Sequence, residues 1–375
     1  MFFGRPIELF EIFGFKVRID LSWFVVAALV TWQLSALTFP SQLPNLAPGT
    51  YWLMGIAGAL AYFVSILLHE LAHSVMARGY GVAIRGITLF IFGGVSEMTE
   101  DPPSAQAELM IAAAGPAASL GLAGALALAT GLDLPGPAVA VLGYLALLNG
   151  SLALLNLIPA FPLDGGRLLR AVLWGWGGNL RRATRISAAI GSGFGLLLVG
   201  VGVVSVLNGF LYGVWIFVLG LFLRNAATAS YQQLLLRRTL EGEPVSRFMH
   251  PDPVTVPRAI SVLELVQSYI YRYHFKMFPV VDDSGRLLGC VTARQVRALP
   301  REEWDRQTVG ALADRCSPEN TIQAGTDAME ALSRMSRTGA SRLMVVDGDR
   351  LLGILSLKDL LRFFSLKMEL ESGPR

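Results

Sequence analysis

Long apolar stretches dominate the first 225 positions of the chain. Six of them approach or exceed the roughly 20 residues that a helix needs to cross a bilayer, and they lie at about 21–39, 52–78, 108–130, 136–158, 186–206 and 209–225. After position 230 the pattern changes to short strand-like and helical segments that carry the charge density of a soluble domain. This pattern predicts a multi-pass α-helical membrane protein with a globular tail.

Composition agrees with this division. Of the 375 residues 53% are hydrophobic and only 16% are charged, and the mean hydropathy is +0.52, which is too apolar for an ordinary soluble enzyme. The segment before the first span contains Glu8, Glu11 and Asp20 and no small-residue cleavage site, so we do not expect a removable signal peptide.

Basic residues are distributed unevenly between the loops. Alternate loops contain no Lys or Arg, whereas the N-terminal segment and the loops after the second and fourth spans are basic. Because short basic loops stay in the cytoplasm, both termini and the tail are predicted to be cytoplasmic in a multi-pass protein of the cell membrane. These loops also explain the net charge of +3, and no nucleic-acid partner is expected. The basic residues are Arg5, Lys16, Arg18, Arg78, Arg85, Arg167, Arg170, Arg181, Arg182 and Arg185.

The second span contains the sequence ILLHELAH, in which His69, Glu70 and His73 form an H-E-x-x-H pattern. The two histidines are four residues apart and therefore share one helix face, where their neutral nitrogens can bind one zinc ion while Glu70 takes a proton from water. Three ionisable groups in a span cost several kcal/mol unless they pair or bind something, so we interpret them as functional.

A catalytic zinc ion usually has three protein ligands. The remaining histidines, His250 and His274, belong to the tail, so the third ligand is expected to be a carboxylate from another span. Residues 156–167, NLIPAFPLDGGR, present Asp164 from backbone that Pro and Gly keep irregular. Taken alone, Asp164 could equally cap the helix that follows it.

Together, HELAH and NLIPAFPLDGG resemble the two signature motifs of the site-2 protease family of intramembrane zinc metalloproteases. This resemblance covers about the first 225 residues. It implies that His69, His73 and Asp164 bind zinc and that Glu70 is the general base.

Two asparagines and one small-residue segment each allow more than one interpretation. Asn149 and Asn156 share a helix face, and each could donate to a developing oxyanion or link two helices; we assign Asn156 to the active site. Residues 112–124, AAAGPAASLGLAG, are interpreted as a close-packing surface. Residues 81–99 read as two short strands, which the resemblance suggests form a small sheet beside the zinc ion where a substrate could pair as an added strand.

The tail contains an internal repeat. FPVVDDSGRLLGCVTARQVRAL, from 278, matches LMVVDGDRLLGILSLKDLLRFF, from 343, and each copy reads as strand, turn, strand and helix after a helical stretch. The pattern resembles a tandem pair of cystathionine-β-synthase (CBS) domains, an α/β module. The predicted domains are 1–225 for the protease, 226–245 for a helical connector and 246–375 for the CBS pair, with repeats at about 246–300 and 308–366.

The CBS resemblance implies a site for an adenine nucleotide. Its G-h-x-T/S-x-x-D element is complete in the second repeat, at Gly353, Ser356 and Asp359, whereas the first repeat has Thr292 but Gln295 in place of the acid. At most one full nucleotide site is therefore indicated. A purely structural module, or one that forms a homodimer through the CBS pair, is an equal alternative.

These observations favour an intramembrane zinc endopeptidase that cleaves a membrane protein in or near its transmembrane segment, with modulation by nucleotide at the CBS pair. The alternative is a nucleotide-regulated transporter or channel, since such tails also occur on transport proteins. A transporter would more typically show duplicated spans and charges along a substrate path, neither of which is evident in the sequence.

Overall fold

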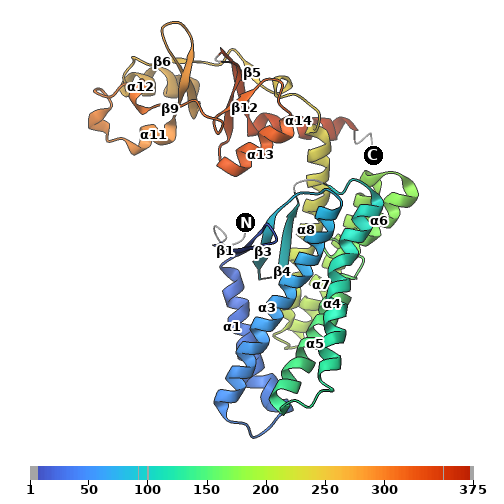
Figure 1. Cartoon of the computed structure of the whole chain (residues 1–375). Coiled ribbons are helices and arrows are strands. Elements are labelled where there is room, and N and C mark those ends of the chain that lie inside the picture. Colours follow the sequence, from blue (N-terminus) through green and yellow to red (C-terminus); the bar gives the residue numbers. More distant parts are fainter. Residues whose placement is uncertain (1–6, 92, 99–100, 349, 372–375) are drawn as a thin grey trace. The chain divides into compact units, whose positions relative to one another are not determined.

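The structure is a computed structural model that describes residues 7–91, 93–98, 101–348 and 350–371. It contains two compact units, Met1–Gln232 and Gln233–Arg375 (Figure 1). Arg5, which contributes to the predicted orientation, lies outside the described residues.

The first unit contains the membrane helices. The described residues include six helices that are long and apolar enough to cross a membrane, which confirms the predicted multi-pass fold. The first is interrupted by a π-helical turn, Leu34–Thr38. The six are Ser22–Gln42, which comprises α1 (Ser22–Gln33), that turn and α2 (Phe39–Gln42), and then α3 (Pro48–Gly79), α4 (Ala105–Ala129), α5 (Gly136–Asn156), α7 (Leu180–Leu207) and α8 (Gly213–Leu240).

A four-stranded sheet packs against α3 (Figure 1). Its order is β1-β2-β3-β4, with β2 and β3 parallel and the other pairs antiparallel, so β1 and β4 form its edges. The two strands expected within residues 81–99 are β3 and β4. Their partners were not predicted. The strands are β1 (Ile7–Ile12), β2 (Phe15–Ile19), β3 (Ile84–Phe90) and β4 (Gly93–Met98).

The unpredicted strand β2 has a clear physical basis. Phe15, Val17 and Ile19 alternate with polar residues and are buried against Leu67 and Leu71 of α3. At the turn that joins β1 to β2, Phe13 and Gly14 both have positive φ angles, as a tight hairpin requires. The result is a sheet anchored on the helix that contains the H-E-x-x-H motif.

The second unit contains two sheets, ordered β6-β7-β8-β9 and β10-β11-β12-β5. Both repeats show the predicted strand, turn, strand and helix after a helical segment. The strands are β5 (His250–Pro251), β6 (Val256–Pro257), β7 (Met277–Val281), β8 (Leu287–Thr292), β9 (Asp314–Arg315), β10 (Thr321–Gln323), β11 (Arg342–Asp347) and β12 (Arg350–Ser356). The helical segments are Val245–Arg247, α9 (Val262–Glu264), Leu265–Ile270, α10 (Tyr271–Tyr273), α11 (Ala293–Ala298), Arg301–Glu303, α12 (Val309–Leu312), α13 (Ala328–Thr338) and α14 (Leu357–Glu371).

The two repeats exchange one two-residue strand each. β5, which precedes the first repeat's sheet in sequence, pairs with β12 of the second repeat, and β9 pairs with β8 of the first. A shared core that includes Met277, Cys290 and Met344 joins the two sheets. Because of this exchange, the two repeats form one structural unit.

Candidate active site

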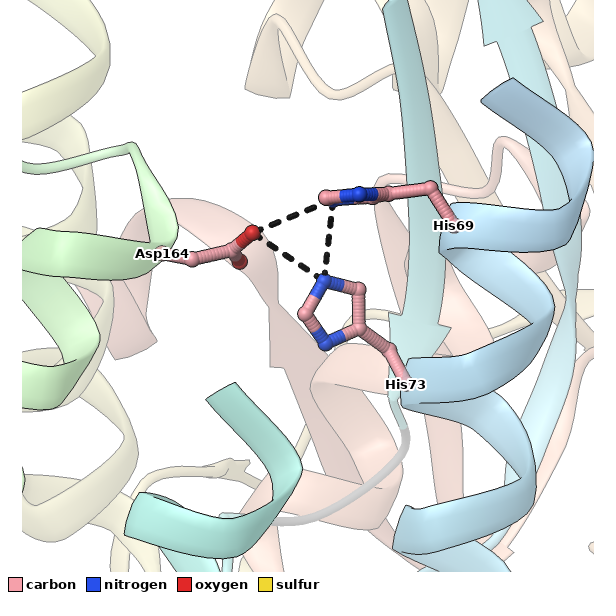
Figure 2. Close-up of side chains that lie close together, drawn as sticks. All are labelled: His69, His73 and Asp164. Carbon is pink, nitrogen blue, oxygen red and sulfur yellow. Dashed lines mark hydrogen bonds and ion pairs between the residues drawn. The ribbon is translucent and has the colours of Figure 1, made fainter. Parts of the chain in front are cut away.

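Helix α3 holds the two histidines of the H-E-x-x-H motif. His69 and His73 lie one turn apart, and their Nε2 atoms are 3.2 Å from each other (Figure 2). Both side chains are buried, with exposed fractions of 4% and 3%. Within a predominantly apolar helix, this face concentrates the two imidazoles at one point.

Asp164 reaches the same point from α6 (Asp164–Gly177). One carboxylate oxygen, Oδ2, lies 3.1 Å from the Nε2 atom of each histidine (Figure 2). The alternative role as a helix cap does not apply, because Leu163 occupies the N-cap position and no side chain caps this helix. His69, His73 and Asp164 are the group of potential metal ligands that the described part of the chain brings together.

Glycines at the start of α6 allow this approach. A side chain at Gly165 would collide with the Leu157 and Ile158 carbonyl groups, and one at Gly166 would collide with the Phe161 backbone. The irregular loop that contains the two prolines therefore packs directly on the first turn of α6. This packing directs Asp164 toward α3.

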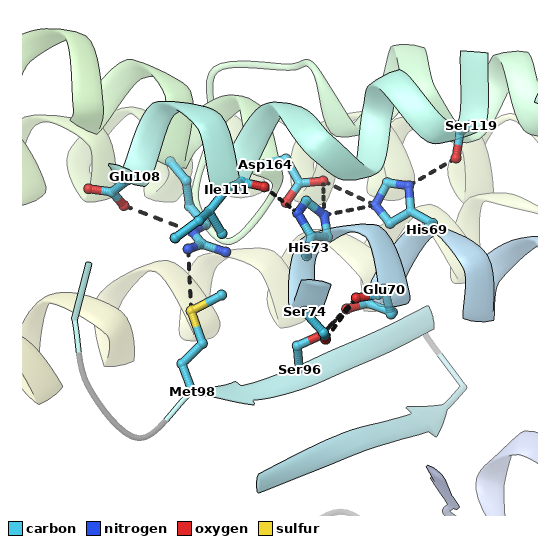
Figure 3. A network of polar contacts seen from close by, with 11 residues as sticks. His69, Glu70, His73, Ser74, Ser96, Met98, Glu108, Ile111, Ser119 and Asp164 are labelled. Atoms are coloured by element: carbon cyan, nitrogen blue, oxygen red, sulfur yellow. Dashed lines mark hydrogen bonds and ion pairs between the residues drawn. The ribbon is translucent and has the colours of Figure 1, made fainter. Parts of the chain in front are cut away.

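The other ring nitrogen of each histidine, Nδ1, forms a hydrogen bond with a residue of α4. His73 Nδ1 donates to the Ile111 carbonyl group over 2.7 Å, and His69 Nδ1 lies 2.9 Å from Ser119 Oγ (Figure 3). A carbonyl oxygen can only accept, so His73 carries its proton on Nδ1 and has the Nε2 lone pair available for a metal ion.

The three converging atoms fit a zinc ion. Their separations of 3.1 to 3.2 Å are close to the roughly 3.3 Å between ligands of a tetrahedral ion with bonds of about 2.0–2.1 Å. Gly115 leaves the space beside them open, because a Cβ atom there would collide with Nε2 of His73 and lie 2.7 Å from that of His69. Nitrogen and carboxylate donors are also the set that zinc accepts in catalytic sites.

Glu70 leaves α3 beside the histidines and approaches strand β4. Its Oε2 atom accepts a hydrogen bond of 2.8 Å from Ser96 Oγ, and its backbone carbonyl accepts one of 2.9 Å from Ser74 Oγ (Figure 3). Gly94 provides room for the carboxylate, since a Cβ atom there would lie 2.9 Å from Glu70 Oε1. The acid is therefore held between α3 and the sheet.

The two asparagines of α5 have different environments. Asn149 is fully buried and donates to Ser65 Oγ over 3.1 Å and to the Leu145 carbonyl group over 2.8 Å, so it links α5 to α3. Asn156 is the last residue of α5, and its side chain forms no hydrogen bond within the described residues. Its assignment to the active site stays a prediction.

The predicted nucleotide-binding residues cap helices of the CBS pair. Ser356 Oγ donates to Asp359, whose other carboxylate oxygen lies 3.1 Å from His250 Nε2. In the first repeat, Thr292 Oγ1 donates to Gln295 Oε1 over 2.6 Å and caps α11. None of Thr292, Ser356 and Asp359 lines the cavity of about 280 Å³ in this unit, which Asp252, Pro253, Thr255, Val281, Gly285 and Leu351 surround.

Several residues at this site were not predicted. Ser119 was assigned only to helix packing, yet its hydroxyl contacts His69. Ser96, Glu108 and Arg170 received no role at the site, although Ser96 binds Glu70 and Arg170 forms a buried ion pair with Glu108. For Glu108 the sequence contained one indication of a role, because it is a charged residue next to a long apolar stretch.

Six membrane helices and a buried cluster of two histidines and one aspartate define a class of protein, the intramembrane metallopeptidases. Comparisons with known proteins agree. The model of peptidase family M50 matches residues 57–136 and 132–200, and the CBS domain model matches residues 245–302 and 312–366.

Two relatives match nearly the whole chain. The protein named Rip3 of Mycobacterium tuberculosis is 34% identical over 96% of this chain and 93% of its own length. The zinc metalloprotease MJ0392 of Methanocaldococcus jannaschii is 30% identical over 96% of both. A solved structure, a site-2 protease from Methanocaldococcus jannaschii, is 29% identical and covers 60% of this chain and 95% of that one with a TM-score of 0.44.

The chain belongs to peptidase family M50, the site-2 proteases. It is a multi-pass membrane zinc metalloendopeptidase with a C-terminal CBS pair. This membership decides against the transporter or channel alternative.

Proposed function

We propose that His69, His73 and Asp164 hold the catalytic zinc ion and that Glu70 is the general base for hydrolysis of a peptide bond in a membrane protein. The observation that supports this most directly is the convergence of three buried ligand atoms at 3.1 to 3.2 Å. A zinc ion at this point supplies a Lewis acid that polarises the scissile carbonyl group and acidifies a water molecule.

Glu70 performs the proton transfers. As the water oxygen bonds to the carbonyl carbon, the Glu70 carboxylate accepts a proton from that water and then delivers it to the nitrogen of the breaking C–N bond. The hydrogen bond from Ser96 orients the carboxylate for both transfers. The Asn156 amide, which has no hydrogen-bond partner among the described residues, is available to donate to the developing oxyanion.

The substrate is proposed to be a transmembrane segment that unwinds before cleavage, since peptide groups inside a helix are hydrogen-bonded and shielded. An unwound segment needs new partners for its backbone inside the membrane. Strand β4 is an edge of the sheet, and its Ser96 and Gly94 contact Glu70. Pairing with β4 therefore brings the substrate backbone beside the general base.

The CBS pair is proposed to modulate this activity by binding an adenine nucleotide in the second repeat. Ser356 and Asp359 there form a hydroxyl and carboxylate pair suited to phosphate and ribose hydroxyl groups. Gln295 lacks the charge at the equivalent place in the first repeat. A homodimer formed through the CBS pair stays a prediction, as do the domain boundaries inferred from sequence.

The tail and both termini are proposed to face the cytoplasm. Lys16 and Arg18 precede the first span and Arg78 lies at the end of the second, and short basic segments of this kind tend to stay in the cytoplasm. His73 lies in the last third of α3 and Asp164 is the first residue of α6, so with this orientation both ligands lie toward the cytoplasmic side. Regulated intramembrane proteolysis of a signalling protein is the process this arrangement suits.

The test compares membrane proteomes of cells that contain the wild-type chain or the Glu70→Gln variant. Substrates accumulate uncleaved in the variant, and each is then tested with the purified enzyme in lipid vesicles. Cleavage there must stop when 1,10-phenanthroline removes zinc and resume when zinc is restored. Cleavage that continues without zinc contradicts the proposal.

A further inference from the structure

One face of α4 lies against the two histidines of the metal cluster. Glu108, Ile111, Gly115 and Ser119 are separated by three, four and four residues, a spacing that places them on one side of a helix. All four are buried. Figure 3 shows Glu108, Ile111 and Ser119 along this helix, with Ile111 and Ser119 beside the two histidines and Glu108 farther toward the start of the helix. We call these four residues the α4 positioning face.

Two members of this face contact the histidines directly. Ser119 Oγ is 2.9 Å from His69 Nδ1, and the Ile111 carbonyl group accepts from His73 Nδ1 over 2.7 Å. Each contact fixes the rotation of an imidazole ring and leaves its Nε2 atom directed at the shared point. Gly115, between them in sequence, keeps that point free of side-chain atoms.

Glu108 connects the same face to α6, the helix that begins with Asp164. It is fully buried, and Arg170 of α6 donates to its Oε1 atom from Nε over 2.7 Å and also from Nη2. The Arg170 guanidinium group lies 5.3 Å from the centre of the Phe161 ring, in the loop that packs on the start of α6. A buried ion pair, in which two N–H groups of Arg170 meet one carboxylate oxygen of Glu108, therefore fixes α6 against α4 less than two turns from Asp164.

We propose that the α4 positioning face sets the geometry of all three metal ligands, with Ser119 as the positioning residue for His69 and Glu108, through Arg170, as the positioning residue for Asp164. This inference rests on the proposed metal-binding role of the three ligands. Helix α3 supplies two of the ligands and α6 supplies the third. Because α4 contacts both helices, it fixes the ligands relative to one another. Neither positioning residue is assigned contact with substrate.

The first test measures zinc affinity by competition with a chelator in the purified full-length protein. Ser119→Ala is expected to weaken zinc binding by about 10- to 100-fold. Ser119→Thr keeps the hydroxyl group and is expected to bind zinc about as tightly as the wild type. Ser187→Ala is the matched control, because Ser187 is buried in α7 and its hydroxyl has no partner among the described residues. The unfolding midpoint of the zinc-free protein should be the same for both alanine variants.

A double-mutant cycle separates positioning from general stabilisation. If Glu108 acts through Asp164, Glu108→Gln weakens zinc binding in the wild type and has little further effect in an Asp164→Asn background. Equal effects in both backgrounds overturn the role of Glu108. Likewise, unchanged zinc affinity in Ser119→Ala overturns the role of Ser119.

A third variant separates failure of this inference from failure of the proposed metal site. His69→Ala must lose zinc if the site is correct. If His69→Ala loses zinc while Ser119→Ala and Glu108→Gln do not, the metal site stands and the positioning role is wrong. If His69→Ala keeps zinc, both the proposed ligand set and the positioning role are contradicted.

Discussion

Ser96 on strand β4 donates a hydrogen bond of 2.8 Å to Oε2 of Glu70 on helix α3. The sheet edge proposed to receive the substrate thus also holds the acid proposed to activate water. Removal of this hydroxyl group in Ser96→Ala should lower kcat by on the order of 10-fold, since an unoriented base loses part of its usual 10²- to 10⁴-fold contribution.

Zinc content provides the internal check for this variant, because Ser96 contacts none of the three proposed ligands through a hydrogen bond in the described structure. Ser96→Thr should recover most of the activity. Turnover by Ser96→Ala at the wild-type rate would show that the hydrogen bond does not orient the base.

The two edges of the sheet allow a matched test of strand pairing. Val95 lies on β4 and Leu9 lies on β1, at the opposite edge. Val95→Pro should lower kcat/KM by about 3- to 10-fold because it disturbs hydrogen bonding of one strand residue, whereas Leu9→Pro should have a smaller effect. Zinc content measured in parallel reports whether the site is intact. Equal losses in both variants would count against pairing at β4.

The Glu108–Arg170 ion pair has a separate effect on stability. Glu108→Met alone leaves the Arg170 charge buried without its partner and should destabilise the protein by about 3–5 kcal/mol. Glu108→Met combined with Arg170→Met removes both charges and should restore most of that loss. Thermal unfolding in detergent measures the stability of the single and the double variant. A double variant no more stable than the single one would show that the helices need the pair itself.

The nucleotide proposal depends on one carboxylate. Asp359→Asn should weaken binding of ATP to the full-length protein by about 10- to 100-fold, the usual effect of losing a charged hydrogen-bond acceptor. Gln295→Ala, at the equivalent position of the first repeat, is the control and should bind ATP normally. Calorimetry that detects no ATP binding to the wild type, or equal binding to Asp359→Asn, would contradict the assignment.

Much of the membrane domain could be predicted from sequence because its signals are local. Run length identifies six spans, and a spacing of four residues places His69 and His73 together on a helix. Pro159, Pro162 and the following glycines mark the broken backbone that presents Asp164. Each of these inferences needs only a short stretch of chain.

The features that were missed depend on tertiary placement. Ser119 lies in a small-residue segment typical of helix packing, and only the position of α3 beside α4 turns its hydroxyl group toward His69. Strands β1 and β2 are short segments next to a span, and β2 pairs with the distant β3 to complete the sheet. The two-residue strands β5 and β9, exchanged between repeats, are too short to give a periodic signal.

The most direct test of the account measures zinc content and peptide cleavage together in purified Glu70→Gln. The substitution keeps the size of the side chain and leaves His69, His73 and Asp164 in place, so we predict zinc content equal to that of the wild type and a loss of cleavage of at least about 100-fold. Undiminished cleavage by the zinc-loaded variant would contradict the central claim that Glu70 is the general base of a zinc peptidase.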